Sequence, residues 1–401
     1  SMQTREYALQ VLQQVFQENG YISLILRNSP FHGIDQAFVS EIVYGTVRNT
    51  LLEQYQWEHF VRKKVSLRTR QLLNMSVYQL FFMDKIPEYA VIHEAVELAK
   101  KQEKGFVNAI LHKVLQQGLI QPEDPCILYS HPAWMYKLWC AHYGQETALQ
   151  IMEADQKRST LYGRINTLKV RKEDLEGAFR FINDYSFIAD ANIFHTAAFS
   201  EGKVLIQDIH SAAIPFYLQL EKGMKVLDVC SAPGTKAQQI AMLMENEGEV
   251  IACDVYPQRV DLIRQVMEKT GVTICTPVCM DGTKENQFEE GSFDRILLDV
   301  PCSGMGDLSH KPEIRYHLQP ENLDELVEVQ KKLLDTNCRY VKQNGVLVYS
   351  TCTLNKKENE TQIQQFLKRH EEFELLRQKT FFPFEENGDG FYVAQLVRKV
   401  L

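Results

Sequence analysis

The stretch from Lys225 to Lys236 reads KVLDVCSAPGTK, and it decides the fold of the second half of the chain. The apolar residues around Asp228 are typical of a buried strand, and apolar residues recur at helical spacing from Ala237 to Leu243. The stretch therefore predicts a strand, a tight loop and the start of a helix. Such a unit places an acidic side chain and free backbone N–H groups at the carboxyl end of a strand, where open α/β sheets bind ligands.

The loop of this unit contains one glycine, Gly234. A dinucleotide fingerprint needs G-x-G-x-x-G, because its glycines let the backbone contact a pyrophosphate. The loop thus favours a nucleoside ligand without a diphosphate. An ordinary βα turn of a Rossmann-like sheet explains the loop equally well.

The same alternation of strand and helix continues to the end of the chain. Strands are predicted to end at five places: Asp228, Asp254, near Asp281, Asp299 and Cys352. Helical runs separate them, which predicts a doubly wound, mostly parallel sheet. Each of these side chains then falls at the edge of the sheet where ligands bind.

The first part of the chain has a different pattern. Helical stripes cover residues 4–18, 39–60, 71–83, 88–101 and 106–115. Residues 118–132 hold three prolines and read as a linker, helices are expected over 133–143, 145–157 and 172–181, and strands over 161–168 and 204–207. We expect an all-α domain over 1–120, a small α+β segment over 121–205 and the sheet domain over 206–401.

Composition narrows the class of protein. The 401 residues carry a formal net charge of −8, and their nine cysteines are scattered, without zinc spacing. We expect reduced thiols in a cytoplasmic monomer, with no metal and no membrane span. A negative total disfavours nucleic acid, but phosphate binding depends on local patches. One basic run, with Arg62, Lys63, Lys64 and Arg68, is a candidate contact for RNA phosphates, and a solvated loop is the plainer interpretation.

Two acids at successive strand ends suit a nucleoside. Asp254 lies 26 residues after Asp228 (254 − 228), where an acid accepts hydrogen bonds from ribose hydroxyls. Asp281 is placed to accept one from an adenine amino group. A helix cap or a solvated loop acid is the alternative at either position.

Two cysteines also fall at strand ends. The loop from Asp299 to Gly304 reads DVPCSG, and amino methyltransferases of this fold tend to carry an aromatic ring where this chain has Cys302. Cys352 follows the next strand, and neighbouring strands lie only about 4.8 Å apart. Asp299, Cys302 and Cys352 are therefore expected to converge on one small substrate. Cysteine is also a common small core residue, which is the alternative.

These segments resemble the RNA 5-methylcytosine methyltransferase family, and specifically its bacterial small-subunit rRNA branch, the Sun/Fmu or RsmB proteins. The matching segments are 228–236 (D-x-C-A-A-P-G-G-K, with Thr235 in place of a glycine), Asp254, 299–303 (D-x-P-C-S) and 351–352 (T-C). Residues 91–99 and 106–108 resemble the all-α NusB fold, which binds RNA, and 389–394 resemble the closing strand of the family.

The resemblance implies S-adenosylmethionine as the cofactor and a cytosine of 16S rRNA as the substrate. It assigns addition to C6 of the base to the Cys352 thiolate and the release step to Cys302. Asp299 is expected to bind the N3 edge of the cytosine, and Lys236 to favour the thiolate. Cofactor contacts are expected from Cys230, Ser231, Ala232, Pro233, Gly234, Thr235, Lys236, Asp254, Arg259, Asp281 and Asp299.

Other functions are compatible with parts of this pattern. A methyltransferase of the same fold acting on another RNA, such as tRNA, or on another atom would keep the cofactor site and would not need Cys352. A non-catalytic RNA-binding factor of the NusB type would not bind S-adenosylmethionine. A nicotinamide oxidoreductase would need the missing glycine fingerprint.

Overall fold

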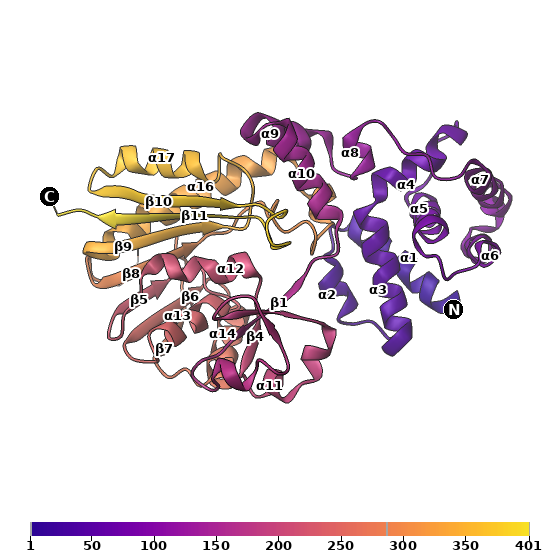
Figure 1. Cartoon of the computed structure of the whole chain (residues 1–401). Helices are drawn as coiled ribbons and strands as arrows, with labels where there is room; N and C mark the ends of the chain where they lie inside the picture. The colour runs from indigo at the N-terminus through magenta and orange to yellow at the C-terminus, as the bar shows by residue number, and fades with distance from the viewer. Residues whose placement is uncertain (1, 286–287, 401) are drawn as a thin grey trace. The chain divides into compact units, whose positions relative to one another are not determined.

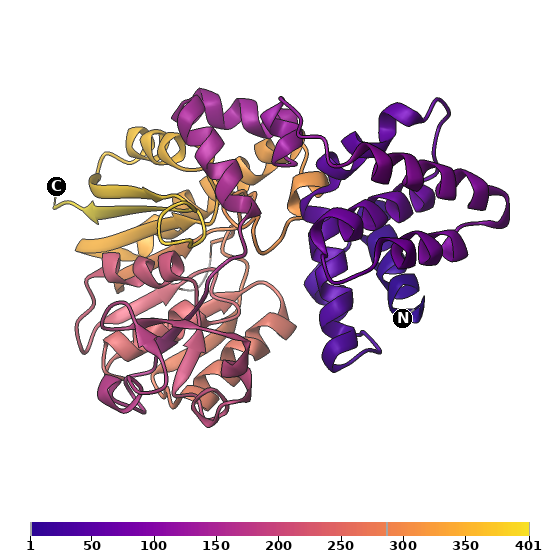
Figure 2. The same cartoon turned by 45° about the vertical axis from the view of Figure 1, so that its right-hand side comes forward.

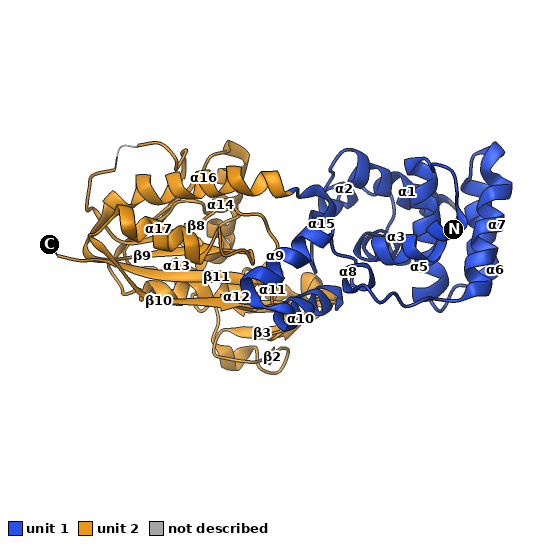
Figure 3. Cartoon of the chain, turned by 90° about the horizontal axis from the view of Figure 1, so that it is seen from above, with its two compact units in different colours: residues 1–157, 308–319 blue, residues 158–307, 320–401 orange. Residues whose placement is uncertain are grey.

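The computed structural model describes residues 2–285 and 288–400. The chain forms two compact units, Ser1–Lys157 with Leu308–Gln319 and Arg158–Asp307 with Pro320–Leu401, coloured separately in Figure 3. No helix within the described residues has both the length and the apolar character to cross a membrane.

Unit 1 is all-α, as the sequence predicts, and Figure 2 shows its helices within residues 2–157 in indigo to purple. Its helices are α1 (Met2–Gln17), α2 (Ile22–Leu26), α3 (Gly33–Arg48), α4 (Thr50–Trp57), α5 (Leu67–Phe82), α6 (Glu88–Leu98), α7 (Lys104–Gln117), α8 (Pro125–Leu128), α9 (Ala133–Tyr143), α10 (Gln145–Gln156) and α15 (Ile314–His317). The apolar stripes of α1 to α7 form one buried core, which includes Leu12, Val43, Leu72 and Leu111.

The stripe expected over residues 39–60 is divided between two helices. Asn49 ends α3, because its side-chain amide and its backbone N–H both donate to the carbonyl oxygen of Gly45. An asparagine that binds nearby backbone in this way favours a helix end over a helix interior. Periodicity alone carries no signal for such a break.

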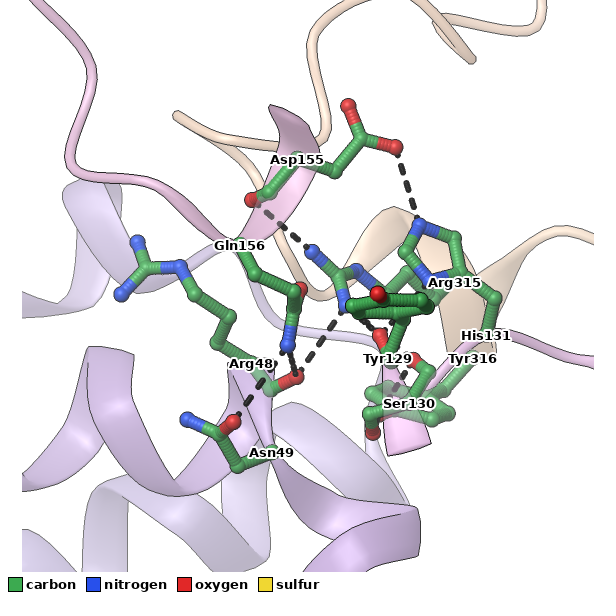
Figure 4. Close-up of polar contacts among 9 residues, drawn as sticks. All are labelled: Arg48, Asn49, Tyr129, Ser130, His131, Asp155, Gln156, Arg315 and Tyr316. Atoms are coloured by element: carbon green, nitrogen blue, oxygen red, sulfur yellow. Dashed lines mark hydrogen bonds and ion pairs between the residues drawn. The ribbon is translucent and has the colours of Figure 1, made fainter. Parts of the chain in front are cut away.

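A short segment distant in sequence completes unit 1. Arg315 of α15 is buried, and its guanidinium donates to the carbonyl oxygens of Arg48 (3.1 Å), Tyr129 (3.2 Å), Ser130 (3.1 Å) and Asp155 (3.4 Å). Figure 4 shows it surrounded by these carbonyl groups. One side chain thus fastens residues 308–319 to the helices of unit 1.

Unit 2 begins with a small antiparallel sheet in the order β2-β3-β1-β4. Its strands are β1 (Leu161–Ile165), β2 (Arg180–Phe181), β3 (Ser186–Ala189) and β4 (Val204–Ile206). The helix expected over 172–181 is wrong: this stretch holds a 3-10 turn, Lys172–Asp174, and then β2. Its aromatic residues pack on Phe187 of β3, with the ring centroids of Phe179 and Phe187 4.4 Å apart, and this packing overrides helical spacing.

The main sheet has seven strands in the order β10-β11-β9-β8-β5-β6-β7, which can be followed in Figure 1. The strands are β5 (Lys225–Asp228), β6 (Glu249–Asp254), β7 (Cys275–Cys279), β8 (Phe293–Asp299), β9 (Val341–Thr351), β10 (Phe373–Phe381) and β11 (Phe391–Arg398). β5 to β9 are parallel, whereas β10 and β11 pair antiparallel at one edge. The predicted mostly parallel, doubly wound sheet is confirmed.

Helices cover both faces of this sheet. α12 (Ile209–Ala213), α13 (Thr235–Leu243) and α14 (Pro257–Thr270) share one apolar core with it, and α16 (Pro320–Asn337) and α17 (Glu360–Arg369) share the other. Strands buried on both faces need continuous apolar runs, as in Val346, Leu347 and Val348 of β9. The parallel strands end at one edge of the sheet, so their carboxyl ends lie together.

Candidate active site

The glycine of the first loop is fixed by close packing. Gly234 has φ +103°, a conformation that side chains rarely adopt, and a Cβ atom there would lie 3.2 Å from the Cα atom of Ile263 in α14. Its N–H donates to Ser231, whose own N–H donates to Cys253 of β6. The loop therefore turns tightly, and α13 starts at Thr235, directly after it.

Asp228 ends β5 beneath this loop and is 1% exposed. Neither of its carboxylate oxygens, nor the hydroxyl of Ser231, has a hydrogen-bond partner within the described residues. Burial raises the pKa of Asp228 to about 7. Buried polar groups are rarely left unpaired in a protein by itself, so these two side chains fit a polar ligand.

Asp254 ends the neighbouring strand and is 6% exposed. It accepts a hydrogen bond from the backbone N–H of Tyr256, and the guanidinium of Arg259 lies 3.8 Å from it. Val255 and Tyr256, which follow it, are about half exposed at 47% and 52%. Sequence reasoning missed these two residues, whose apolar surfaces at the ligand edge suit a flat ring.

Asp281 follows β7 by two residues and is more open. Its Oδ1 atom accepts hydrogen bonds from the backbone N–H and the hydroxyl of Thr283, and these bonds lower its pKa. The side chain thus caps its own turn, which is the structural role named above as the alternative to adenine binding.

The two cysteines of the sequence analysis lie together. The Sγ atoms of Cys302, after β8, and Cys352, after β9, are 3.2 Å apart. Gly306 packs closely beside the Cys352 loop: its N–H donates to the carbonyl oxygen of Cys352, and a Cβ atom there would collide with the carbonyl oxygens of Gly390 and Cys352. The prediction that the two loops converge is therefore confirmed.

Asp299 lies beside this pair at the end of β8. Its Oδ2 atom forms a 2.9 Å ion pair with Lys236 of α13, and its Oδ1 atom accepts a hydrogen bond from Ser350. Burial lowers the pKa of Lys236, but the carboxylate of Asp299 outweighs burial, so the net shift is upward. The first loop, the end of β8 and the cysteine pair therefore form one site.

The pKa of Cys352 is raised well above its ordinary value. The main cause is its hydrogen bond with Cys302, and burial and the nearby carboxylates of Asp307 and Asp299 add to it. Cys352 is therefore a thiol near neutral pH in the free protein. The reactive form of a cysteine is the thiolate, so a reaction at Cys352 would require the site to favour ionisation of this thiol.

Sequence reasoning also missed Glu358 and Asn359, both buried between β9 and α17. Each makes hydrogen bonds to residues beside the cysteines. The available signal was the pattern Asn355-x-x-Glu358-Asn359, which places polar residues directly after the strand that carries Cys352.

The basic run lies between α4 and α5 in unit 1. Arg62, Lys63 and Lys64 are exposed, and the Lys63 ammonium lies 4.5 Å from the ring centroid of Phe106. Arg68 is half-buried and donates to the carbonyl oxygen of Leu98 at the end of α6. Part of the Arg68 guanidinium therefore serves the fold of unit 1.

Comparisons with known proteins match this architecture along nearly the whole chain. Family models match residues 2–116 (NusB family), 131–179 (the ferredoxin-like domain of the RsmF/B-like methyltransferases) and 215–397 (16S rRNA methyltransferase RsmB/F). The probable ribosomal RNA small subunit methyltransferase B of Bacillus subtilis strain 168 is 33% identical, with 98% of each chain covered. The chain belongs to the RsmB/F family of 16S rRNA methyltransferases. The resemblance inferred from the sequence is confirmed.

Two further similarities agree with this membership. Ribosomal RNA small subunit methyltransferase B of Escherichia coli strain UMN026 is 29% identical over 98% of both chains. The crystal structure of a protein named PH0851 shares the fold with a TM-score of 0.81, 23% identity and coverage of 99% of this chain and 98% of that one.

Proposed function

We propose that this RsmB/F-family enzyme transfers a methyl group from S-adenosylmethionine to C5 of one cytosine of 16S rRNA, through a covalent bond between Cys352 and C6. The observation that carries the proposal is the pair of sulfur atoms 3.2 Å apart beside Asp299. C5 and C6 of a cytosine are bonded neighbours, so two thiols this close can serve both carbons of one base.

The chemistry explains why two thiols are needed. C5 of cytosine is a poor nucleophile until the Cys352 thiolate adds to C6, because the new C6–S bond places electron density on C5. Asp299, whose carboxylate is held by Lys236, is assigned to the N3 edge of the ring. After C5 gains the methyl group, Cys302 takes the C5 proton as a thiolate base, the C5–C6 double bond reforms and Cys352 leaves. The target base must leave its stack to enter the pocket.

Lys236 has two roles in this proposal. Its raised pKa keeps it a cation at neutral pH, and it holds Asp299 by the 2.9 Å ion pair. A fixed positive charge near Cys352 also favours the thiolate over the thiol, which offsets part of the upward shift of the Cys352 pKa.

The residues around the first loop fit S-adenosylmethionine. The unpaired carboxylate of Asp228 suits the amino group of the methionine part, Asp254 the ribose hydroxyls, and Val255 and Tyr256 the adenine ring. We assign the predicted loop residues from Cys230 to Lys236 to the same ligand. The cofactor supplies an electrophilic methyl group, and the protein supplies its orientation and the nucleophile.

The proposal extends to the parts of the chain outside this site. We assign residues 1–120 to RNA binding, 121–205 to a small α+β segment and 206–401 to catalysis. Arg62, Lys63 and Lys64 are exposed and are the proposed phosphate contacts, with the half-buried Arg68 beside them. We place this monomer in the cytoplasm, on 16S rRNA or an assembling particle.

The test is nucleoside analysis after incubation with methyl-labelled S-adenosylmethionine and 16S rRNA. Label in 5-methylcytidine, lost in Asp254→Asn together with cofactor binding, is the expected result. Label on an exocyclic nitrogen, or in tRNA and not in 16S rRNA, would contradict the proposal. An absence of S-adenosylmethionine binding in calorimetry would instead favour the non-catalytic RNA-binding factor.

A further inference from the structure

Glu358 is buried, and each of its two carboxylate oxygens accepts two hydrogen bonds. Oε1 accepts from the backbone N–H of Ser303 (2.9 Å) and from Gln330 (3.0 Å), and Oε2 accepts from the hydroxyl of Ser303 (2.6 Å) and from Asn355 (2.8 Å). All four partners are donors, as a carboxylate requires. Ser303 is the residue that follows Cys302.

The other neighbour of Cys302 belongs to the same network. Gln330 of α16 donates to Glu358 and also to the carbonyl oxygen of Pro301 (2.9 Å). The residues on both sides of Cys302 are thus bound, directly or through one amide, to the carboxylate of Glu358.

Asn359 forms hydrogen bonds to the residues on both sides of the second cysteine, Cys352. Its amide oxygen accepts a hydrogen bond from the hydroxyl of Thr351 (2.6 Å), and its amide nitrogen donates to the carbonyl oxygen of Thr353 (2.9 Å). Thr351 and Thr353 flank Cys352. A carbonyl group can only accept, so these two partners fix the orientation of the Asn359 amide.

We infer that Glu358 and Asn359 are positioning residues that set the places of the two sulfur atoms, Glu358 for Cys302 and Asn359 for Cys352. Because the two are adjacent in the chain, one rigid peptide unit fixes the distance between the two thiols. This inference rests on the proposed function, which gives Cys352 the addition step and Cys302 the release step.

Isosteric substitutions separate the two roles. In Glu358→Gln, an NH₂ group faces donors that the carboxylate accepted, so the loop of Cys302 must shift. The loop of Cys352 keeps both of its hydrogen bonds to Asn359, and its contact with the shifted loop is the 2.7 Å hydrogen bond between the hydroxyls of Thr353 and Ser303. In Asn359→Asp, an oxygen faces the carbonyl oxygen of Thr353, so the loop of Cys352 must shift. A displacement near 1 Å at a reacting group costs about 100-fold in rate.

The two variants are expected to fail at opposite steps. Glu358→Gln slows release, so turnover falls about 10- to 100-fold and a covalent RNA–protein adduct accumulates on denaturing gels, as for Cys302→Ala. Asn359→Asp slows addition, so turnover falls without an adduct, and in the Cys302→Ala background the adduct forms about 10- to 100-fold more slowly.

The controls distinguish positioning from loss of structure. Glu360→Gln is the matched control, because its carboxylate makes no hydrogen bond to either cysteine loop within the described residues, and it should keep wild-type turnover. Both positioning variants should bind S-adenosylmethionine within about twofold of wild type, since neither residue touches Asp228 or Asp254. If Glu358→Gln does not fold, Ser303→Ala takes its place. This variant removes one donor to Glu358 and the hydrogen bond to the Thr353 hydroxyl, and it should show a milder adduct phenotype.

The experiment is a time course of adduct and of 5-methylcytidine for these variants beside Cys302→Ala and Cys352→Ala. Adduct accumulation in Glu358→Gln, and its absence in Asn359→Asp, establishes the inference. Wild-type turnover in both variants, or the same pattern of loss in both, overturns it. If Cys302→Ala itself traps no adduct, the proposed function fails instead, so the two failures are distinct.

Discussion

The Sγ atoms of Cys302 and Cys352 lie 3.2 Å apart across 50 positions of sequence. Parallel pairing of β8 with β9 brings the loops side by side, with Asp299 opposite Ser350 in register. Gly306 then lets one loop approach the carbonyl group of Cys352. The register of the two strands thus places the two thiols side by side.

The raised pKa of Cys352 predicts how the rate depends on pH. Since the thiolate reacts and its pKa lies above the ordinary value, the single-turnover rate should rise by about tenfold per pH unit from pH 7 into the alkaline range. Lys236→Met removes the nearby cation and should displace this rise to higher pH. A rate independent of pH between 7 and 9, with the chemical step limiting, would argue against Cys352 as the nucleophile.

Asp228 predicts how stability depends on pH. Its pKa is about 7 in the folded protein against 3.8 ordinarily, so the folded chain keeps a proton that the unfolded chain has lost. Its contribution to the free energy of unfolding therefore falls as pH rises from about 4 to about 7, by roughly 4 kcal/mol. Asp228→Asn cannot ionise and should lack this fall.

Urea denaturation of both proteins at pH 5 and pH 8 measures the effect. The variant should gain stability relative to wild type at pH 8, and its affinity for S-adenosylmethionine should drop at both pH values. Parallel stability profiles for the two proteins would show that Asp228 is ionised and solvated in the folded chain.

Arg315 is predicted to hold unit 1 together. Arg315→Met leaves four carbonyl groups, two of them in buried hydrogen bonds, without this donor and should lower the free energy of unfolding by roughly 3 kcal/mol. Arg171→Met is the matched control, because its side chain is 81% exposed and should change stability by less than about 0.5 kcal/mol. Equal urea midpoints for the two variants would refute this role.

The basic run is predicted to bind rRNA phosphates. Changing Arg62, Lys63 and Lys64 to Glu should weaken 16S rRNA binding and flatten its dependence on salt concentration. Arg68 is left intact, because the loss of its hydrogen bond to Leu98 would disturb the fold, and an effect on folding could then be mistaken for an effect on RNA binding. Filter binding from 50 to 200 mM salt measures the slope.

The control for that experiment has the same change of charge. The exposed lysines Lys222, Lys332 and Lys368 of unit 2, changed to Glu, should leave the slope closer to that of wild type. If both triple variants weaken binding equally, only the net charge of the protein matters, and the assignment of the basic run is lost.

The sequence was sufficient to predict the fold class and the residues at the ends of the parallel strands. Alternating strands and helices dictate a parallel sheet, and in such a sheet Asp228, Asp254, Asp299 and Cys352 must share an edge. The helix expected over 172–181 failed because its aromatic residues pack on Phe187, and that contact is not local in sequence.

The residues that hold the two cysteine loops in place could not be predicted from the sequence either. Glu358 binds Ser303 across 55 positions, and its local pattern, Asn355-x-x-Glu358-Asn359, does not identify that partner. The ion pair of Lys236 with Asp299 spans 63 positions in the same way. Periodicity places side chains on strands and faces, whereas these partners depend on how the loops meet above the sheet.

The central claim is a covalent bond between Cys352 and the target cytosine, and a denaturing gel of labelled 16S rRNA tests it most directly. With S-adenosylmethionine present, Cys302→Ala should give an RNA–protein band of retarded mobility, and the Cys302→Ala, Cys352→Ala double variant should give none. Methylation that survives in Cys352→Ala, or a band that persists in the double variant, would contradict the account.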